Sequence, residues 1–374
     1  MESTTQQTSE DVKRATCPVN SFNEWDPLEE VIVGRLENAV IPPGHVTVTY
    51  NVPRSVARLV KLFGGLRYPR WVVKAAQKQL DEFIHILEAE GVKVQRPDII
   101  DHSARFSTPY WESRGFCIAC PRDGFLVLGD EIIETPMVWR SRYFEAYAYR
   151  RLFKEYFAQG ARWTAAPKPE LQDSLFDYDF EMPTHDGPMR YVINDSEPVF
   201  DAADFIRAGK DLFYQKSNVT NDSGVEWLRR HVGDRFRIHQ IESRCLDPMH
   251  IDSSVTLLAP GKILVNPEYI DVDRLPAMFK SWDVIVAPEP DPLSDSDVMA
   301  RFFSMCSKWI SLNVLSLDEE RVIVEKTQVG MQRVLKEHGF KPIPCSFANY
   351  LPFGGAFHCA TLDIRRRGTL QSYF

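Results

Sequence analysis

Apolar residues recur at helical spacing in several parts of the chain, and each such stretch is followed by a short apolar run. In the range 71–90 they keep the period of one helix face, and Gly91 precedes the run 92–94. The same order of helix, stop and strand is predicted four more times, without the glycine in the third of these units. The helices are predicted at 143–159, 224–231, 273–280 and 328–338, and the strands that follow at 162–164, 236–241, 284–286 and 341–344. The five irregularly spaced units indicate an internal repeat.

Further apolar runs between these units predict additional strands, at 28–34, 125–128, 132–133, 254–258, 263–265 and 321–324. Strand pairs that alternate with helices exclude all-α and all-β folds. Five such units can close into a ring around a central axis, as in radial repeat folds. No linker composition divides the chain, so we predict one α/β domain at 17–374, preceded by a polar, flexible segment at 1–16.

Composition and charge limit the class of protein. The chain has 374 residues, 44% of them hydrophobic and 26% charged, which is ordinary for a globular protein. Its net charge of −8 argues against a nucleic-acid or anionic-membrane partner. We find no apolar run of the ~20 residues that a membrane helix needs, and the polar N-terminus has no signal-peptide character. These features predict a cytoplasmic protein.

Cysteine usage supports the same compartment. An odd number of cysteines, seven in all, is scattered over a long chain, which is typical of a reducing environment. Cys117 and Cys120 form a C-x-x-C pair, a spacing found in redox and zinc sites. No second pair completes four zinc ligands, so the spacing favours neither role.

The stretch FGGAFHCAT at 353–361 contains the leading candidate for a nucleophile. A cysteine thiolate just past a glycine-rich turn can attack an electrophilic carbon. The stretch reads as a short strand, which would point His358 and Cys359 to opposite faces, so we expect the catalytic base to come from elsewhere. A small buried hydrophobic residue is the more common role of an isolated cysteine.

Acids and a histidine occur at other strand or turn positions. They are Asp123, Asp201, Asp204, His250 and Asp252. If 249–252 is extended, His250 and Asp252 share one face, as a base and a cation-binding carboxylate in one cleft would. Taken singly, each acid is more often a cap or half of an ion pair. Asp201 or Asp204 would cap a helical turn toward Arg207, and Asp123 would cap a turn or pair with Arg122.

Together, a thiol, an imidazole and several carboxylates fit guanidinium chemistry. Carboxylates bind a guanidinium through bidentate charged hydrogen bonds. Thiolate attack on its carbon gives a covalent intermediate, and histidine can protonate the departing amine. We find no Walker A motif, no G-x-G-x-x-G after a strand and no H-E-x-x-H motif, so nucleotide binding and zincin chemistry lack support.

Several long segments resemble the arginine:glycine amidinotransferase family, and the resemblance covers nearly all of 17–373. The segments are NEWDPLEEVIVG at 23–34, FDAADFIRAG at 200–209, PMHID at 248–252 and RRRGTLQSY at 365–373. The resemblance implies the five-bladed α/β propeller of guanidine-modifying enzymes, built from ββαβ units. It also implies a homodimer and a ping-pong reaction without metal or organic cofactor, in which L-arginine donates an amidino group and releases ornithine.

The resemblance also assigns roles. Cys359 would be the nucleophile, His250 the general acid and base, and Asp201 the residue that polarises His250 or the guanidinium. The residues implied to bind substrate are Asp123, Asp252, Ser307, Asp247 and Met249.

Two positions depart from the enzymes that make guanidinoacetate. Tyr269 stands where the family has an arginine that binds the substrate carboxylate, and a phenol cannot replace a guanidinium. Asp247 replaces an uncharged asparagine, and an acid there disfavours an acceptor carboxylate. We therefore predict a larger amine as the acceptor, one that can be cationic, in a toxin-type secondary-metabolite pathway.

Other interpretations remain open at this point. One is glycine as the acceptor. A second is an arginine-deiminase-like hydrolase with the same Cys359, His250 and acids but water as the acceptor. A third is a non-enzymatic arginine-binding propeller. A papain-like protease is weaker, because the local sequence around its cysteine is absent.

Overall fold

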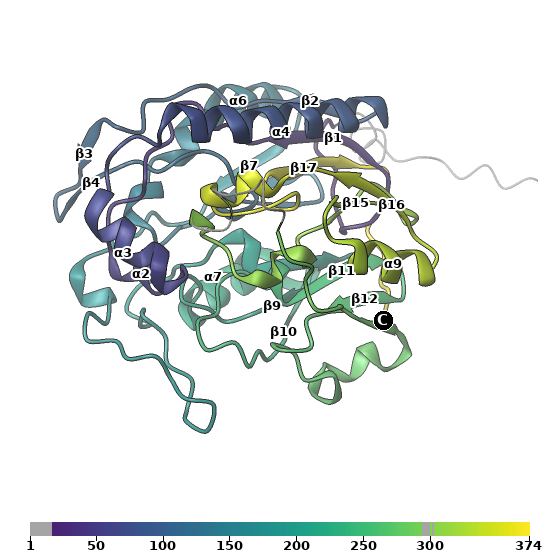
Figure 1. Cartoon of the computed structure of the whole chain (residues 1–374). Coiled ribbons are helices and arrows are strands. Elements are labelled where there is room, and N and C mark those ends of the chain that lie inside the picture. Colours follow the sequence, from purple (N-terminus) through teal and green to yellow (C-terminus); the bar gives the residue numbers. More distant parts are fainter. Residues whose placement is uncertain (1–16, 294–299, 301–302) are drawn as a thin grey trace, which may run out of the picture.

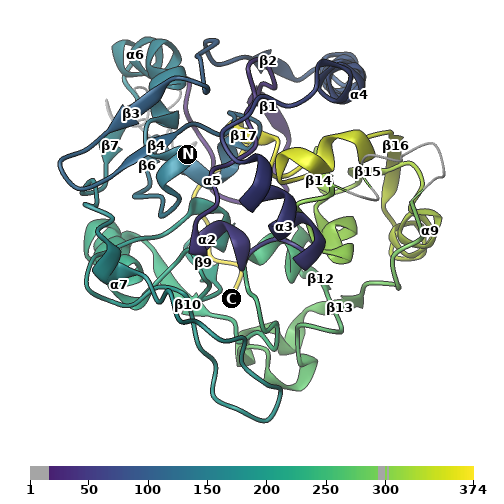
Figure 2. The same ribbon diagram turned by 60° about the vertical axis from the view of Figure 1, so that its left-hand side comes forward.

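Five three-stranded sheets are arranged around a common centre. The computed structural model describes residues 17–293, 300 and 303–374, so the predicted flexible segment at 1–16 lies outside the described residues. Figure 2 shows α6, α4, α9 and α7 at the periphery, with α5, β1 and β17 nearer the middle. The five-bladed α/β propeller is therefore confirmed, whereas the boundary of the domain at residue 17 stays a prediction.

Each blade follows the same ββαβ order. Its first and second strands pair antiparallel, and its third strand pairs parallel to the second. A parallel neighbour requires a crossover connection, which the peripheral helices supply. The blades are β17 (Thr361–Arg366), β1 (Leu28–Val33) and β2 (Lys93–Gln95); β5 (Phe125–Leu128), β6 (Glu131–Glu134) and β7 (Arg162–Ala165); β8 (Phe205–Ala208), β9 (Asp211–Tyr214) and β10 (Arg237–Gln240); β11 (Val255–Ala259), β12 (Lys262–Val265) and β13 (Asp283–Val286); and β14 (Leu315–Ser316), β15 (Arg321–Glu325) and β16 (Lys341–Cys345).

The first blade joins the two ends of the chain. β17 pairs antiparallel with β1, with Val31 opposite Asp363, while β2 pairs with β1 on its other side. This pairing closes the ring, and it holds the segment that precedes β17 against the N-terminal part of the fold. Cys359 lies in that segment.

The crossovers explain where helix predictions held and where they failed. They are α4 (Arg70–Ala89), η2 (Glu145–Tyr149) with α6 (Arg150–Ala158), α7 (Asp222–Val232), η7 (Val272–Arg274) with η8 (Ala277–Ser281), and α9 (Val329–Glu337). The helix predicted at 273–280 is wrong: Pro276 lacks an N–H and disfavours helical geometry before it, which leaves two 3₁₀ turns. The α-helix predicted from 143 starts only at Arg150.

Helix α4 shows how an outer element positions the site. Its buried face is formed by Val72, Ala76, Leu80, Phe83 and Leu87, at the helical spacing that the sequence predicts. The ring of Phe83 contacts that of Phe357, with centroids 5.2 Å apart, and burial of such a ring contributes about 1.5–3 kcal/mol. Figure 1 shows α4 running above β1 and β17. The helix thus braces the turn that contains Cys359.

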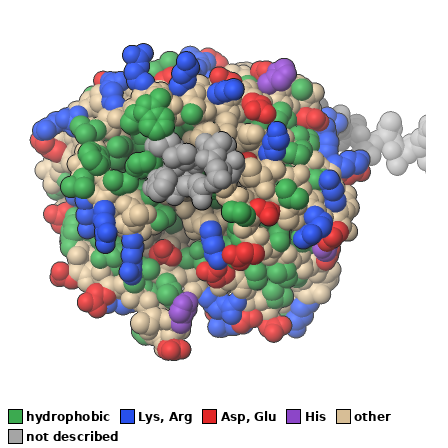
Figure 3. All heavy atoms as spheres, viewed as in Figure 1, with side chains coloured by type: hydrophobic (Ala, Val, Ile, Leu, Met, Phe, Trp, Pro, Cys, Tyr) green, Lys and Arg blue, Asp and Glu red, His purple; other side chains and the backbone are tan. Residues whose placement is uncertain are grey.

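The remaining elements lie between the blades or over their centre. They include α2 (Val46–Thr49), α3 (Arg54–Phe63), the hairpin of β3 (Arg105–Ser107) and β4 (Glu112–Arg114), and η10 (Ala348–Phe353). Figure 2 shows α2 and α3 over the middle of the ring. On the face seen in Figure 3, side chains of both charge signs are interspersed over the described surface. Within the described ranges, no helix is both long and apolar enough to cross a bilayer.

A short non-strand segment precedes the first strand of every blade. α5 (Pro121–Gly124) leads into β5, η4 (Ala202–Asp204) into β8, η6 (Ile251–Ser253) into β11, η9 (Lys308–Leu312) into β14, and the turn 357–360 into β17. Neighbouring entry segments contact one another, as α5 does η4, η4 does η6, and η6 does η9. We call these five the entry segments. Residues far apart in sequence meet there.

Two local predictions at the entry segments are wrong. Cys359 lies in a turn before β17 and not in a strand, because Thr361 Oγ1 donates to the carbonyl oxygens of Phe357 and His358 at 3.0 and 3.1 Å. The predicted extended stretch 249–252 is instead a sharp bend: His250 has φ 60°, and a 3₁₀ turn follows it. Positive φ is uncommon for a residue with a side chain and is found often at functional sites.

Candidate active site

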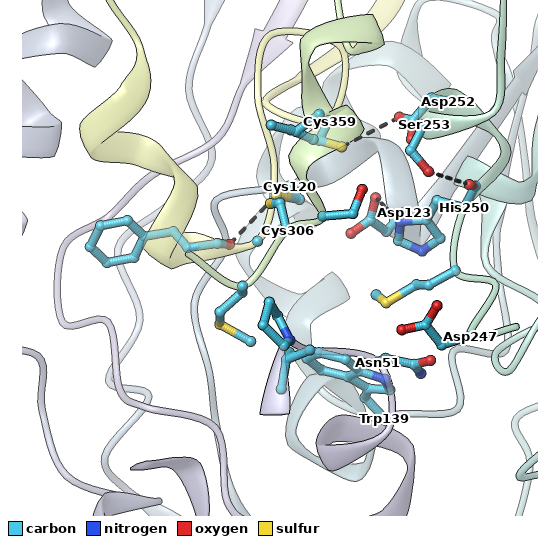
Figure 4. Close-up of a pocket in the computed structure, with 18 of the residues that line it drawn as sticks. Asn51, Cys120, Asp123, Trp139, Asp247, His250, Asp252, Ser253, Cys306 and Cys359 are labelled. Atoms are coloured by element: carbon cyan, nitrogen blue, oxygen red, sulfur yellow. Dashed lines mark hydrogen bonds and ion pairs between the residues drawn. The ribbon is translucent and has the colours of Figure 1, made fainter. Parts of the chain in front are cut away.

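A cavity of about 310 Å³ opens where the entry segments meet. That volume is at the lower end of small-molecule sites, which span about 300–1,000 Å³. Seven of the eight predicted site residues line it, and Figure 4 shows most of them facing the same space. The seven are Cys359, His250, Asp123, Asp252, Ser307, Asp247 and Met249. The fold therefore brings these residues together in one cavity, as the sequence predicts, and their roles stay predictions.

Cys359 is buried, at 2% exposure, at one end of this cavity. Its thiol donates to Asp252 Oδ2 at 3.3 Å, and Asn313 Nδ2 donates to its sulfur at 3.1 Å. The hydrogen bond with Cys120, burial and the negative charge of Asp252 raise the pKa of Cys359 well above its usual value, against the lowering effect of His250. The free enzyme therefore holds Cys359 as a thiol at neutral pH.

His250 is held between two acids. Its Nε2 lies 3.1 Å from Asp201 Oδ2, and its Nδ1 lies 3.7 Å from Asp123 Oδ1. Burial works against the charged imidazole, but the carboxylates of Asp123 and Asp201 prevail and raise the pKa of His250 well above its usual value. His250 is thus protonated at neutral pH and can supply a proton to a leaving group.

Asp201 is the predicted site residue that does not line the cavity. It lies behind His250, and burial raises the pKa of its carboxyl group. Asp204 lies further back, accepts hydrogen bonds from Ser217 and Thr220 at 2.5 Å, and has a pKa raised to about 7 by burial. One oxygen each of Asp123, Asp201 and Asp204 is buried without a hydrogen-bond partner. Such groups are costly unless something binds them.

Asp252 and His358 form a second pair beside the nucleophile. His358 Nδ1 lies 2.9 Å from Asp252 Oδ2, and its Nε2 lies 3.4 Å from Glu24 Oε2. The hydrogen bond from His358 keeps the pKa of Asp252 below its usual value in spite of burial. Both ring nitrogens of His358 thus contact carboxylates of the protein. This agrees with the expectation that the catalytic base is a residue other than His358.

Asp123 has a different cationic partner from the one that sequence adjacency suggests. Arg142 donates to Asp123 Oδ2 at 2.6 Å and to both oxygens of Glu145. Arg122 instead binds Asp363 Oδ1 at 2.6 Å. One oxygen of Asp123 is therefore neutralised within the chain, while the other faces His250.

Asp247 and Tyr269, the two positions that depart from the family, lie together near the cavity mouth. Asp247 is exposed and accepts a hydrogen bond from the Cys245 thiol at 3.4 Å. Among the described residues it forms no ion pair. Tyr269 lines the same cavity and shares a hydrogen bond with Ser307. Figure 4 places Asp247 beside Asn51, beyond His250 as seen from Cys359.

The sequence reasoning missed several residues of this region. Asn313 contacts Cys359, and Trp139 and Gln215 line the cavity with polar atoms that have no partner. A signal for Asn313 existed, since it lies two positions before β14, just as Cys359 lies two positions before β17 and Asp123 two before β5. Aligning the repeats by their first strands would have found it.

The C-x-x-C pair lies in the cavity wall. The thiols of Cys117 and Cys120 point toward the carbonyl oxygen of Phe353, at 3.9 and 3.7 Å. In the described part of the chain, no group of three or more His, Cys, Asp or Glu side chains is arranged to hold a metal ion.

Comparisons with known proteins agree with this geometry, although no protein-family model matches. The chain is 48% identical over 358 residues to the L-arginine:L-lysine amidinotransferase of Pseudomonas savastanoi pv. phaseolicola, which covers 96% of this chain and 97% of the relative. It is 46% identical over 365 residues to the mitochondrial glycine amidinotransferase of Gallus gallus, covering 96% and 85%. A solved structure, SxtG, an amidinotransferase of the saxitoxin biosynthetic pathway from Microseira wollei, superposes with a TM-score of 0.88 at 56% identity and covers 96% of this chain and 100% of its own. The chain belongs to the amidinotransferase family.

Proposed function

We propose that this enzyme moves the amidino group of L-arginine through Cys359 to an acceptor amine and releases ornithine. The observation that carries the proposal is a surplus of buried acid around a thiol. Asp123 keeps one buried oxygen without a hydrogen-bond partner, and this oxygen faces His250 in the cavity that also contains Cys359 and Asp252. A guanidinium would supply the missing donors and charge, because carboxylates bind it through charged hydrogen bonds.

The first half-reaction begins when arginine binds. Its guanidinium pairs with Asp123 and Asp252, so the thiol of Cys359 loses its acceptor and gains a nearby positive charge. The pKa of the thiol falls and its proton passes to solvent. Cys359 Sγ then attacks the guanidinium carbon, and His250 gives its proton to the departing nitrogen. The bond from carbon to that nitrogen breaks, which leaves ornithine and a positively charged amidino-thioether.

The second half-reaction uses the same groups in reverse. The acceptor ammonium first loses one proton to solvent, and the free amine then attacks the amidino carbon while His250, now neutral, accepts a second proton from the attacking nitrogen. The carbon–sulfur bond breaks and Cys359 leaves as a thiolate. The product is a new guanidinium compound, and the charge is balanced in each half. Asp201 would orient His250 and stabilise its charged form through the 3.1 Å contact.

We further propose an acceptor larger than glycine, of the kind found in toxin-type secondary metabolism. Asp247 offers an exposed carboxylate without an ion pair among the described residues, and Tyr269 adds no positive charge for an acceptor carboxylate. Both features favour an amine with a second cationic group. Relatives named for L-lysine transfer and for the saxitoxin pathway support this proposal.

The decisive experiment mixes the protein with L-arginine and no acceptor, and measures the intact mass. We expect one added amidino group and an equal amount of ornithine, with neither from Cys359→Ala. Cys345→Ala is the matched control, since Cys345 is buried outside the cavity and should still gain the group. Citrulline without an adduct would instead favour the hydrolase, and neither product would favour a non-enzymatic arginine-binding protein.

The acceptor is tested by discharging the adduct. Glycine, L-lysine and diamines that carry a guanidino group are added in turn to the amidinated enzyme. We expect the longer, cationic amines to discharge it with a higher specificity constant than glycine. A higher specificity constant for glycine would make this a glycine amidinotransferase. Only the proposal on the acceptor would then fail, and the proposal of amidino transfer through Cys359 would stand.

A further inference from the structure

Asn313 holds Cys359 at two points. It follows η9, is 1% exposed, and accepts from the backbone N–H of Cys359 at 3.1 Å through Oδ1. Its Nδ2 donates to Cys359 Sγ, also at 3.1 Å. A backbone N–H can only donate, so the amide oxygen must face it, and this leaves the NH₂ group toward the sulfur. The orientation of the amide is thus set by the backbone.

The contact comes from outside the substrate cavity. Asn313 does not line the cavity that contains His250 and Asp252, but a neighbouring one of about 340 Å³, together with Ala356 and Phe357. The amide therefore approaches the sulfur from a different side than a substrate would. A guanidinium can enter without displacing it, so the N–H···S contact can persist through the reaction.

The repeat makes this amide stand out from its counterparts. Asp123 occupies the same position before β5, and Asp252 lies three residues before β11. Both acids raise the pKa of Cys359 through their negative charge. In the blade that begins at β14 the corresponding residue is a neutral amide that points an N–H group at the sulfur. A hydrogen bond from a donor favours the charged form of the acceptor.

We propose that Asn313 is a catalytic residue that stabilises the Cys359 thiolate through its Nδ2–H group. The thiolate occurs twice in the reaction, first as the nucleophile and later as the leaving group from the acceptor adduct. One donor therefore serves both half-reactions. The role rests on the proposed function of Cys359 as nucleophile, but it concerns a property, thiolate stability, that is measured without any substrate.

The test compares two variants by the pH dependence of Cys359 alkylation with iodoacetamide, followed by peptide mapping that separates it from the other cysteines. Asn313→Asp keeps an oxygen for the Cys359 N–H but loses the donor. Asn313→Leu loses the donor without adding charge. We expect both to raise the alkylation pKa, by about one unit or more for the Asp variant, so that the rate below the pKa falls about tenfold. kcat should fall more than the KM for arginine changes.

A matched control is Asn221→Asp. Asn221 is equally buried. It accepts a hydrogen bond from the backbone N–H of Gly224 at 2.8 Å and donates to two carbonyl oxygens, and none of these contacts involves Cys359. It should leave the alkylation profile of Cys359 unchanged, whatever its effect on stability.

Several outcomes would overturn the proposal. A profile of Asn313→Asp that coincides with that of the wild type would reduce Asn313 to a support of the turn. A shift in the Asp variant without one in a folded Leu variant would reduce the effect to added charge. If the wild type gains no amidino group from arginine while the alkylation shifts remain, the proposed function fails and the thiolate role of Asn313 stands.

Discussion

Two buried clusters of charge lie side by side in this enzyme, and they differ in how completely they are paired. The arginine–carboxylate cluster consists of Glu24, Arg122, Arg207, Asp363 and Arg366, all at 6% exposure or less. Each oxygen of its two carboxylates has a guanidinium partner. In the site cluster of Asp123, Asp201, Asp204, His250 and Asp252, three oxygens have no hydrogen-bond partner.

The difference distinguishes a fully paired structural cluster from the cluster to which we assign the proposed catalysis. A buried ion is tolerated when its pairing is complete, and the arginine–carboxylate cluster meets this condition with residues from β8, β17 and α5. In the site cluster, the proposed substrate guanidinium would pair with Asp123 and Asp252, whereas Asp201 and Asp204 lie outside the cavity. His358 joins the two, since it binds Asp252 on one side and Glu24 on the other. The paired cluster thus contacts the site cluster through His358 at Asp252.

The largest expected effect comes from breaking the paired cluster. Asp363→Asn should lower the free energy of unfolding by about 3–5 kcal/mol, because three buried guanidinium groups lose a shared counter-charge. Chemical denaturation measures it. The exposed pair of Glu320 and Lys341 is the control, and Glu320→Gln should cost less than about 1 kcal/mol. Equal losses would contradict the distinction between the clusters.

The same change in the site cluster should affect catalysis and not stability. Asp201→Asn removes an acid whose ionisation burial disfavours, so the free energy of unfolding at neutral pH should not fall. The arginine half-reaction should slow by about 100-fold, within the range of general acid–base effects. The rate of this half-reaction should fall at high pH, where His250 loses its proton. In the variant this fall should occur at lower pH, because Asp201 raises the pKa of His250 and the reaction needs protonated His250.

Stopped-flow measurement of ornithine release across pH tests this prediction. A loss of stability as large as that of Asp363→Asn would place Asp201 with the supporting cluster.

Asp204 sharpens the comparison through the pH dependence of stability. Burial raises its pKa to about 7, so the native state holds a proton that the unfolded state loses at lower pH. Because the native state binds more protons than the unfolded state in this window, the contribution of Asp204 to the free energy of unfolding falls as the pH rises from about 4 to about 7. Asp204→Asn should lack this fall. Denaturation midpoints of both proteins across pH should diverge toward neutral pH, and parallel curves would exclude the effect.

The smallest expected effect lies at the cavity mouth. Asp247→Asn should raise the KM of a cationic acceptor by about fivefold or less, because exposed charge pairs contribute at most about 1 kcal/mol. The difference should shrink as salt is added, since Asp247 is exposed to solvent. Acceptor kinetics at low and high ionic strength measure it. An unchanged KM for cationic amines would remove Asp247 from acceptor recognition.

Much of the architecture follows from local patterns. Spacing and turn chemistry predict the buried face of α4, the strand 125–128 and the helix end at Gly91. Each of these features depends on residues near it in the chain. The local prediction failed at Pro276 and around His250, where a proline and a positive φ interrupt the expected geometry. The single domain, the homodimer and the cytoplasmic location stay predictions.

The sequence by itself determined the residue types of the site and the order of the blades. Repetition of short motifs and resemblance to a family led to Cys359, His250 and the acids as candidates, whose catalytic and binding roles stay predictions. Only the tertiary structure decided which charges are paired: Asp123 with Arg142 and not Arg122, and Asn313 with Cys359. These contacts join segments of different blades, and a partner across blades has no fixed spacing in the chain. Ring closure selects it, because packing brings the entry segments to one centre.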